Sequence, residues 1–111
     1  MSDRHDRDYL EHILRAAEAI QRSASRGRER YLADEDAFDA GLRRLQAIAE
    51  STQRLSSRLK DRHPEIPWAR IAGFRNRVVH AYRDIDPDLV WSVIQDELPA
   101  LVRLAGAELG R

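Results

Sequence analysis

Apolar residues recur at steps of three and four along most of this chain, and this spacing constrains the fold more than any other feature. Such a period places side chains on one face of an α-helix, whereas a half-buried strand needs alternation of apolar and polar residues. No sustained alternation of β-branched residues occurs, and only five glycines and four prolines interrupt the 111 residues. The sequence therefore predicts an all-α protein, an up-and-down bundle of four to five helices joined by short connections.

The boundaries between helices are predicted from residues that cap or stop a helix. Asp34 and Asp86 suit N-cap positions, because an aspartate carboxylate accepts hydrogen bonds from the free backbone N–H groups of the first turn. Proline fits that turn, where its missing N–H is not needed. The expected segments are a helix over 6–25, a connection over 26–33, a long helix from the Asp34 cap to Leu59, a helix over 68–82 with Pro67 at its start, and a last helix from Pro87.

Two residues inside the expected helices are unusual. Gly41 lies within the second long helix, where glycine costs about 1 kcal/mol relative to alanine, and its presence indicates close packing against a neighbour. Pro99 lies inside the last helix and must either kink it or divide it in two. The sequence does not distinguish between these two outcomes.

Length, cysteine content and charge limit the class of protein. A chain of 111 residues fits a single domain spanning 1–111, with one core and no need of crosslinks. The absence of cysteine excludes a disulfide scaffold, a thiolate zinc site and a cysteine nucleophile. Nineteen basic residues balance nineteen acidic ones, so any contact with a polyanion must come from a local patch. The charged N-terminal segment and the lack of an apolar run of ~20 residues predict a cytoplasmic protein with no membrane partner.

The segment 68–82 places a charged side chain within an apolar stripe. A buried guanidinium without a partner is costly, so Arg75 must extend along the stripe to solvent, pair with an acid on another helix, or serve a function. Tyr82 falls within the same stripe. The apolar members of the stripe are Trp68, Ile71, Phe74, Val78 and Val79.

The opposite face of this segment consists of small or neutral residues. Ala69 and Gly73 permit close approach of another helix, either from a second subunit or from the rest of the bundle. Asn76 and His80 are four residues apart and can touch, in which case the amide would orient the imidazole. A histidine at the end of a helix is equally explained by pairing with the backbone carbonyls or the helix dipole.

The same segment is locally cationic on a chain of zero net charge. No acid occurs between Glu65 and Asp84, whereas Arg70, Arg75, Arg77 and Arg83 all lie there. A second cationic stretch, 22–30, holds four arginines and one acid. Such stretches are more often solvated faces than phosphate sites, but the first also contains a titratable base.

These residue types suit one chemistry better than others. Cleavage of RNA through its own 2′-hydroxyl needs a general base, a general acid and stabilisation of a pentavalent phosphorane. His80 can transfer protons near neutral pH and Arg75 can hold the equatorial oxygens, with no carboxylate expected close by. The four histidines lack metal-ligand spacing, so neither a metal nor another cofactor is expected. A Ser-His-Asp hydrolase is unsupported as well, because no nucleophile-elbow pattern occurs.

The octapeptide RNRVVHAY at 75–82 matches the R-x-x-x-x-H-x-Y motif of the HEPN superfamily, and the chain resembles the HepT-like toxins of type VII (MNT–HEPN) toxin–antitoxin pairs. The flanks PEIPW and IAGF before the motif, and DID and VW after it, agree with this family. Ala49-Glu50 resembles the Gly-Glu that commonly precedes this region. The similarity covers roughly 38–101 and is weaker in the first helix.

The resemblance implies a HEPN-like helical fold and a homodimeric, metal-independent endoribonuclease whose active site lies where the motifs of two subunits meet. In such a site Arg75 and His80 would be catalytic. Asn76 would orient the histidine or the phosphate. The remaining cations of the segment would contact RNA phosphates; these are Arg70, Arg77 and Arg83.

The resemblance also implies a protein partner. This partner is a nucleotidyltransferase (MNT) antitoxin, which binds the toxin or transfers AMP from ATP to the motif tyrosine, here Tyr82. A different class of protein is the alternative: a HEPN helical module that binds a nucleotidyltransferase or a nucleotide and cleaves nothing. The intact Arg75 and His80 argue against that alternative without excluding it.

Overall fold

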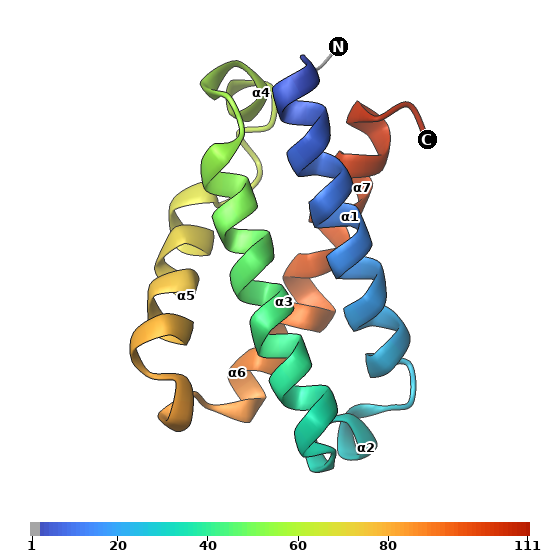
Figure 1. The fold of residues 1–111 in the computed structure, drawn as a ribbon, viewed down its shortest axis with the longest axis vertical. Helices are drawn as coiled ribbons and strands as arrows, with labels where there is room; N and C mark the ends of the chain where they lie inside the picture. Colours follow the sequence, from blue (N-terminus) through green and yellow to red (C-terminus); the bar gives the residue numbers. More distant parts are fainter. Residues whose placement is uncertain (1–2) are drawn as a thin grey trace.

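Four helical stretches run side by side in the structure, a computed structural model that describes residues 3–111 (Figure 1). Within these residues there is no strand, which confirms the all-α bundle. The elements in chain order are α1 (Arg4–Ala24), α2 (Arg28–Ala33), α3 (Glu35–Arg54), α4 (Ser57–Asp61), α5 (Trp68–His80), the 3₁₀ turn η1 (Tyr82–Asp84), α6 (Pro87–Ser92), the π-helical segment η2 (Val93–Glu97) and α7 (Leu98–Glu108).

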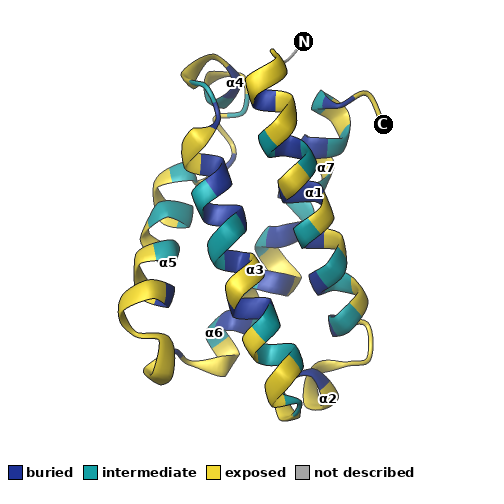
Figure 2. Ribbon diagram, viewed as in Figure 1, coloured by how far each residue is buried: buried dark blue, intermediate teal, exposed yellow. Residues whose placement is uncertain are grey.

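The helix α3 lies at the centre of this arrangement. It packs against α1 on one side and against α5 on the other, while α7 covers α1 from behind (Figure 1). Buried residues line the inner sides of these helices and exposed residues their outer sides (Figure 2). On α1 the buried apolar residues follow the predicted spacing: Leu10, Ile13, Ala17, Ile20 and Ala24. No helix of the described residues combines the length and the apolar character needed to cross a membrane.

The second long helix is not continuous to Leu59, contrary to the prediction. The helix α3 ends at Arg54, and α4 starts after Ser56, whose hydroxyl accepts a hydrogen bond from the Leu59 N–H. The carboxylate of Asp6, a residue only 2% exposed, accepts hydrogen bonds from the Ser56 N–H (2.8 Å) and hydroxyl (2.6 Å). The N-terminus of α1 therefore fixes the break between α3 and α4.

Three other boundaries differ from the sequence-based prediction. The stretch 26–33 is not a plain connection, because Gly27, with φ +102°, turns the chain directly into the short helix α2. The helix predicted over 68–82 ends at His80, and Tyr82 lies in η1. Pro67 occupies the N-cap position of α5 rather than its first turn.

The predicted caps are confirmed, and the structure decides what happens at Pro99. Asp34 accepts from the Ala37 N–H and Asp86 from the Asp88 N–H. The last helix neither breaks nor ends at Pro99. After α6 the backbone takes the wider π-helical form in η2 and then continues as α7. Pro99 therefore lies in the first turn of α7, where a missing N–H is tolerated.

Gly41 is in close contact with a neighbouring helix, as its position predicted. A Cβ at position 41 would overlap the hydroxyl oxygen of Tyr31 and lie 3.3 Å from its Cζ. Tyr31 is fully buried, and its hydroxyl has no hydrogen-bond partner among the described residues. This burial raises the pKa of the Tyr31 phenol, while the nearby charges of Arg44 and Arg26 lower it. An unsatisfied buried hydroxyl is destabilising.

Replacing Tyr31 should therefore stabilise the fold. We expect Tyr31→Phe to raise the free energy of unfolding by about 1 kcal/mol, because it removes a desolvated hydroxyl that forms no bond. Gly41→Ala should lower it by about 2 kcal/mol through overpacking, and by less in the Tyr31→Phe background. Urea denaturation of wild type, the two single variants and the double variant measures this double-mutant cycle. Strictly additive effects, or destabilisation by Tyr31→Phe, would contradict the contact.

Candidate active site

The motif residues lie on the last turns of α5 and on the turn that follows. Val78 is buried in the core, and the other apolar residues of the stripe, Trp68, Ile71 and Phe74, are partly buried against it. The prediction that Val79 belongs to this stripe is wrong, because Val79 is 40% exposed. Rotated ~100° from Val78, its side chain points away from the core.

Arg75, whose guanidinium lies within the apolar stripe, is paired with an acid. Its Nη2 and Nε donate hydrogen bonds to Oε2 of Glu50 on α3, at 2.9 and 3.2 Å. Of the possibilities that the sequence left open for Arg75, the structure shows pairing with an acid on another helix. The expectation of no carboxylate close to the motif is wrong. Glu50 is 25 residues away along the chain, and the packing of α5 on α3 brings it there.

The ion pair sets the electrostatics of the site. The hydrogen bond from Arg75 holds the pKa of the Glu50 carboxyl below its usual range. Partial desolvation opposes this shift, whereas a hydrogen bond from Gln46 and the charges of Arg75 and Arg54 add to it. Both members of the pair are partly open to solvent. Glu50 is consequently ionised at neutral pH, and the side chain of Arg75 remains 31% exposed.

Asn76 and His80 do not form a hydrogen bond with each other. The amide oxygen of Asn76 instead accepts a hydrogen bond from Nη1 of Arg75 (3.3 Å). The imidazole of His80 is exposed at the C-terminal end of α5 and takes part in no hydrogen bond or ion pair within residues 3–111. Asn76 is therefore placed to orient the guanidinium, while the histidine ring is accessible to a ligand.

Tyr82 lies next to α3. Its phenol is beside Asp39 and within electrostatic reach of Arg43, and the residue is 40% exposed. Partial desolvation and the Asp39 carboxylate raise the pKa of the Tyr82 phenol, whereas Arg43 lowers it. The first half of α3 therefore faces the end of the motif.

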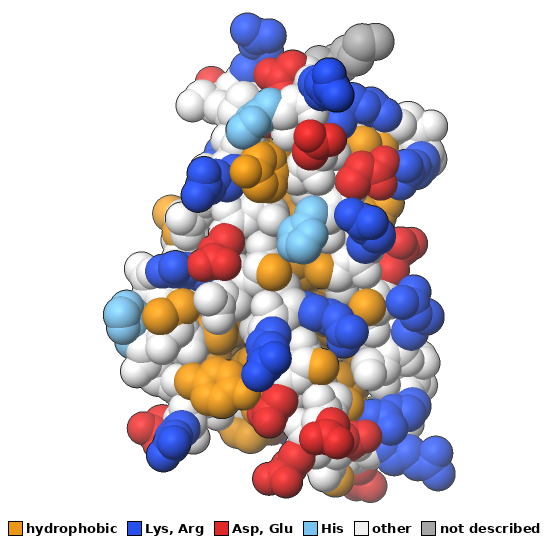
Figure 3. Space-filling view, viewed as in Figure 1, with side chains coloured by type: hydrophobic (Ala, Val, Ile, Leu, Met, Phe, Trp, Pro, Cys, Tyr) orange, Lys and Arg blue, Asp and Glu red, His pale blue; other side chains and the backbone are white. Residues whose placement is uncertain are grey.

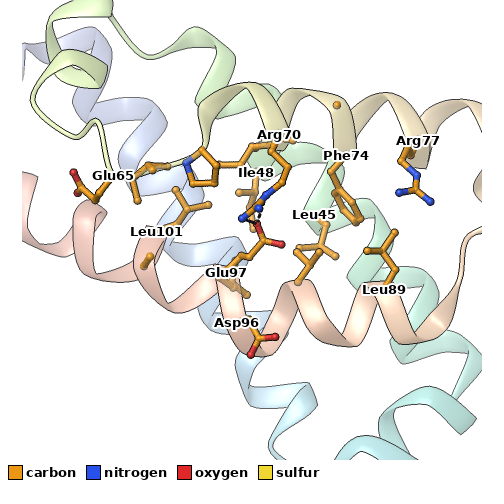
Figure 4. A pocket seen from close by; sticks show the side chains of 18 residues that line it. Leu45, Ile48, Glu65, Arg70, Phe74, Arg77, Leu89, Asp96, Glu97 and Leu101 are labelled. Atoms are coloured by element: carbon orange, nitrogen blue, oxygen red, sulfur yellow. Dashed lines mark hydrogen bonds and ion pairs between the residues drawn. The ribbon is translucent and has the colours of Figure 1, made fainter.

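The three remaining arginines do not gather around Arg75. Arg70 and Arg77 line a cavity of about 550 Å³ on the other flank of α5, between α5, η2 and α7 (Figure 4). There Arg70 donates to Glu97 at 2.7 and 3.0 Å, across the opening. Arg83 is exposed in η1. The cations predicted to contact phosphates thus point to at least two sides of α5.

Sequence reasoning missed a row of polar residues on α3. Asp39, Arg43, Gln46 and Glu50 follow a 4-3-4 spacing, which places them on one face of the helix. This spacing is visible in the sequence, but only the packing of α5 on α3 shows that the polar face meets the motif. Figure 3 shows acids and bases interspersed over α1 and α3 rather than one continuous basic patch.

Two other histidines form hydrogen bonds near the ends of the bundle. His5 bonds to the Arg54 carbonyl at 3.0 Å, and His63 bonds to Glu108 at 2.7 Å. Across residues 3–111, no group of three or more His, Cys, Asp or Glu side chains is arranged to hold a metal ion.

Comparison with known proteins defines the class. The chain matches the family model "Ribonuclease HepT-like" over residues 13–107, which includes most of α1. It is 33% identical over 99 residues to "Probable ribonuclease HepT" of Thermococcus cleftensis, covering 88% of this chain and 90% of that protein. It is also 33% identical over 96 residues to a "Putative RNase" of Caldanaerobacter subterraneus, covering 86% of each. No solved structure matches the chain significantly.

The family match and the helical bundle thus identify a protein of the HEPN superfamily. Within that superfamily, the chain belongs to the HepT-like ribonuclease family.

The Arg75–Glu50 pair predicts a specific dependence of stability on pH. Because the pKa of Glu50 is lowered in the folded state, the pair stabilises the fold above the unfolded-state pKa of about 4.3, and this contribution is lost as the pH falls. The difference in unfolding free energy between wild type and Arg75→Gln should therefore be largest near neutral pH. Carboxyl NMR should show the pKa of Glu50 returning toward its usual value in Arg75→Gln. An unchanged Glu50 titration would contradict the pair.

Proposed function

We propose that this protein is the toxin of a type VII (MNT–HEPN) toxin–antitoxin pair, a metal-independent endoribonuclease neutralised by a nucleotidyltransferase antitoxin. One observation carries the proposal: a chain of the HepT-like family presents an intact Arg75, His80 and Tyr82 at one accessible helix end. An exposed imidazole and a partly exposed guanidinium are groups that transesterification of RNA requires.

In the proposed reaction the 2′-oxygen of RNA attacks the adjoining phosphorus and the bond to the 5′-oxygen breaks. A base takes the proton of the 2′-hydroxyl and an acid gives one to the leaving 5′-oxygen, so that no net proton is gained or lost; His80 serves as this base or this acid. Arg75 stabilises the negative charge on the non-bridging oxygens. Asn76 supports this role by its hydrogen bond to the guanidinium, and so acts on the phosphate through Arg75.

We place the active site between two copies of the chain. Arg75 and His80 are about 140° apart around α5, and Arg75 is turned toward α3, so one copy holds them awkwardly around a single phosphate. Ala69, Gly73 and Asn76 are exposed, and a Cβ built at Gly73 would meet nothing within 4 Å. This face can receive a second α5 closely. A homodimer would then supply Arg75 from one subunit and His80 from the other.

The three other arginines would contribute unequally to RNA binding. Arg77 and Arg83 form no ion pair within the described residues, which leaves their guanidinium groups available to phosphates. Arg70 would first have to leave Glu97.

Substitution of the catalytic residues should remove both toxicity and cleavage. Expression without the partner should slow growth, and Arg75→Ala or His80→Ala should abolish this with at least about a hundredfold loss of RNA cleavage. The matched controls Arg103→Ala and His12→Ala change exposed residues on α7 and α1 and should have no effect. Cleavage of total RNA by wild type should persist in EDTA.

Mixing the two inactive variants tests the shared site. Co-expressed Arg75→Ala and His80→Ala subunits should recover part of the activity, because mixed dimers contain one complete site. Folded variants as active as wild type would contradict the catalytic assignment. A wild type that binds a nucleotidyltransferase but cleaves no RNA would favour the non-catalytic helical module.

Neutralisation is proposed to act at Tyr82. Transfer of AMP from ATP joins the phenol oxygen to the α-phosphate and releases pyrophosphate. The phenol lies in η1, two residues beyond His80 and accessible to solvent, so an enzyme that reaches the active site reaches it as well. The attached phosphate would be attracted by the nearby arginines and would exclude RNA.

Tyr82→Phe should retain most of the ribonuclease activity but lose protection by the nucleotidyltransferase and ATP. The hydroxyl is not assigned to proton transfer, yet it is the group that would accept AMP. Intact mass after co-incubation measures this, with a gain matching AMP on wild type alone. The same gain on Tyr82→Phe would place the modification elsewhere, and complete loss of cleavage would make the tyrosine catalytic.

A further inference from the structure

An aromatic ring is left open to solvent beside the proposed active site. Tyr82 and Val79, each 40% exposed, are the exposed large hydrophobic residues in the described part of the chain. They flank His80 along the sequence, at the end of α5 and in η1. In a protein that acts on RNA such a ring has a direct use, because the face of any unpaired base can stack on it.

The polar row on α3 supplies a cation next to this ring. Two acids of α3 face the motif: Glu50 accepts hydrogen bonds from Arg75, and Asp39 acts on the phenol of Tyr82 and raises its pKa. Arg43 lies between these two acids on the same helical face, one turn from Asp39. It is exposed and forms no ion pair within residues 3–111. An unpaired guanidinium therefore lies along the same side of the site as the ring.

The acids around Arg43 are already engaged. The Asp39 carboxylate lies beside the Tyr82 phenol, and that of Glu50 accepts two hydrogen bonds from Arg75. Arg75 compensates part of the charge of Glu50 and so reduces its repulsion of a phosphate, whereas the uncharged phenol leaves the charge of Asp39 in place. Arg43 is then the cation on this face of α3 best placed to meet an RNA backbone that continues past Arg75.

We propose that the ring of Tyr82 and the guanidinium of Arg43 form a nucleotide subsite, in which an unpaired base stacks on Tyr82 and its phosphate pairs with Arg43. This rests on the proposed function, because it presupposes an RNA substrate. A base in a duplex cannot present its face to the ring, so the subsite selects single-stranded RNA. AMP attached to Tyr82 would occupy the same space, which gives the modification a second way to exclude RNA.

Binding of a 2′-O-methyl RNA oligonucleotide tests the subsite, because this probe cannot be cleaved through its 2′-oxygen. Fluorescence anisotropy would compare wild type with Tyr82→Phe, Tyr82→Leu, Arg43→Gln and Arg44→Gln. Tyr82→Leu should weaken binding about tenfold and Tyr82→Phe less than about twofold, because phenylalanine still stacks. A hairpin duplex of the same chemistry should bind more weakly and be insensitive to Tyr82→Leu.

The two neighbouring arginines form a matched pair. Arg44 is also exposed but lies ~100° around α3 from Arg43, where its charge lowers the pKa of Tyr31 rather than that of Tyr82. Arg43→Gln should weaken binding about tenfold and reduce the slope of log Kd against log salt by roughly one, whereas Arg44→Gln should change neither. Equal effects of these two variants, or of Tyr82→Leu and Tyr82→Phe, would overturn the subsite. A wild type that neither binds nor cleaves RNA would instead overturn the proposed function on which it rests.

Discussion

The ion pair between Arg75 and Glu50 is the constraint on which the arrangement of the site depends. A guanidinium within the apolar stripe of α5 has to be paired, and the acid that pairs with it is on α3. This fixes the rotation of α5 about its axis, so that Val78 enters the core while Ala69, Gly73 and Asn76 face solvent. The same contact that pairs the partly buried guanidinium thus also leaves this face exposed.

The helix α3 consequently serves two purposes at once. Its apolar face, with Leu42, Leu45 and Ile48, belongs to the core, and its polar row lies along the motif. Rigid packing of the first face gives the second a fixed position, because side chains in a well-packed core cannot shift independently. The site is therefore held by a long helix of the bundle rather than by a loop, although its most exposed member, Tyr82, lies in a short turn.

The features predicted correctly from the sequence are those that depend on neighbouring residues. Helix periodicity, the Asp34 and Asp86 caps and the tight contact at Gly41 all follow from local rules. The break at Ser56 does not follow from local rules, because the apolar spacing continues in phase across the break. What stabilises the break is the carboxylate of Asp6, 50 residues away along the chain. Glu50 was named only as part of the family resemblance, and its pairing with Arg75 was not predicted for the same reason, since only tertiary packing brings it to the motif. The roles of Arg75, His80 and Asn76 in the reaction stay predictions.

The charges of the site also bear on how an RNA would be chosen. The chain has zero net charge, and two of the cations on α5 are paired internally, Arg75 with Glu50 and Arg70 with Glu97. A chain of zero net charge exerts little long-range attraction on a polyanion such as RNA. Contacts at short range must then carry most of the discrimination. A phosphate that binds Arg75 must replace part of its interaction with Glu50, so the net gain in binding free energy is only the difference between the two interactions. Substrates whose bases and 2′-hydroxyls make additional contacts are therefore favoured.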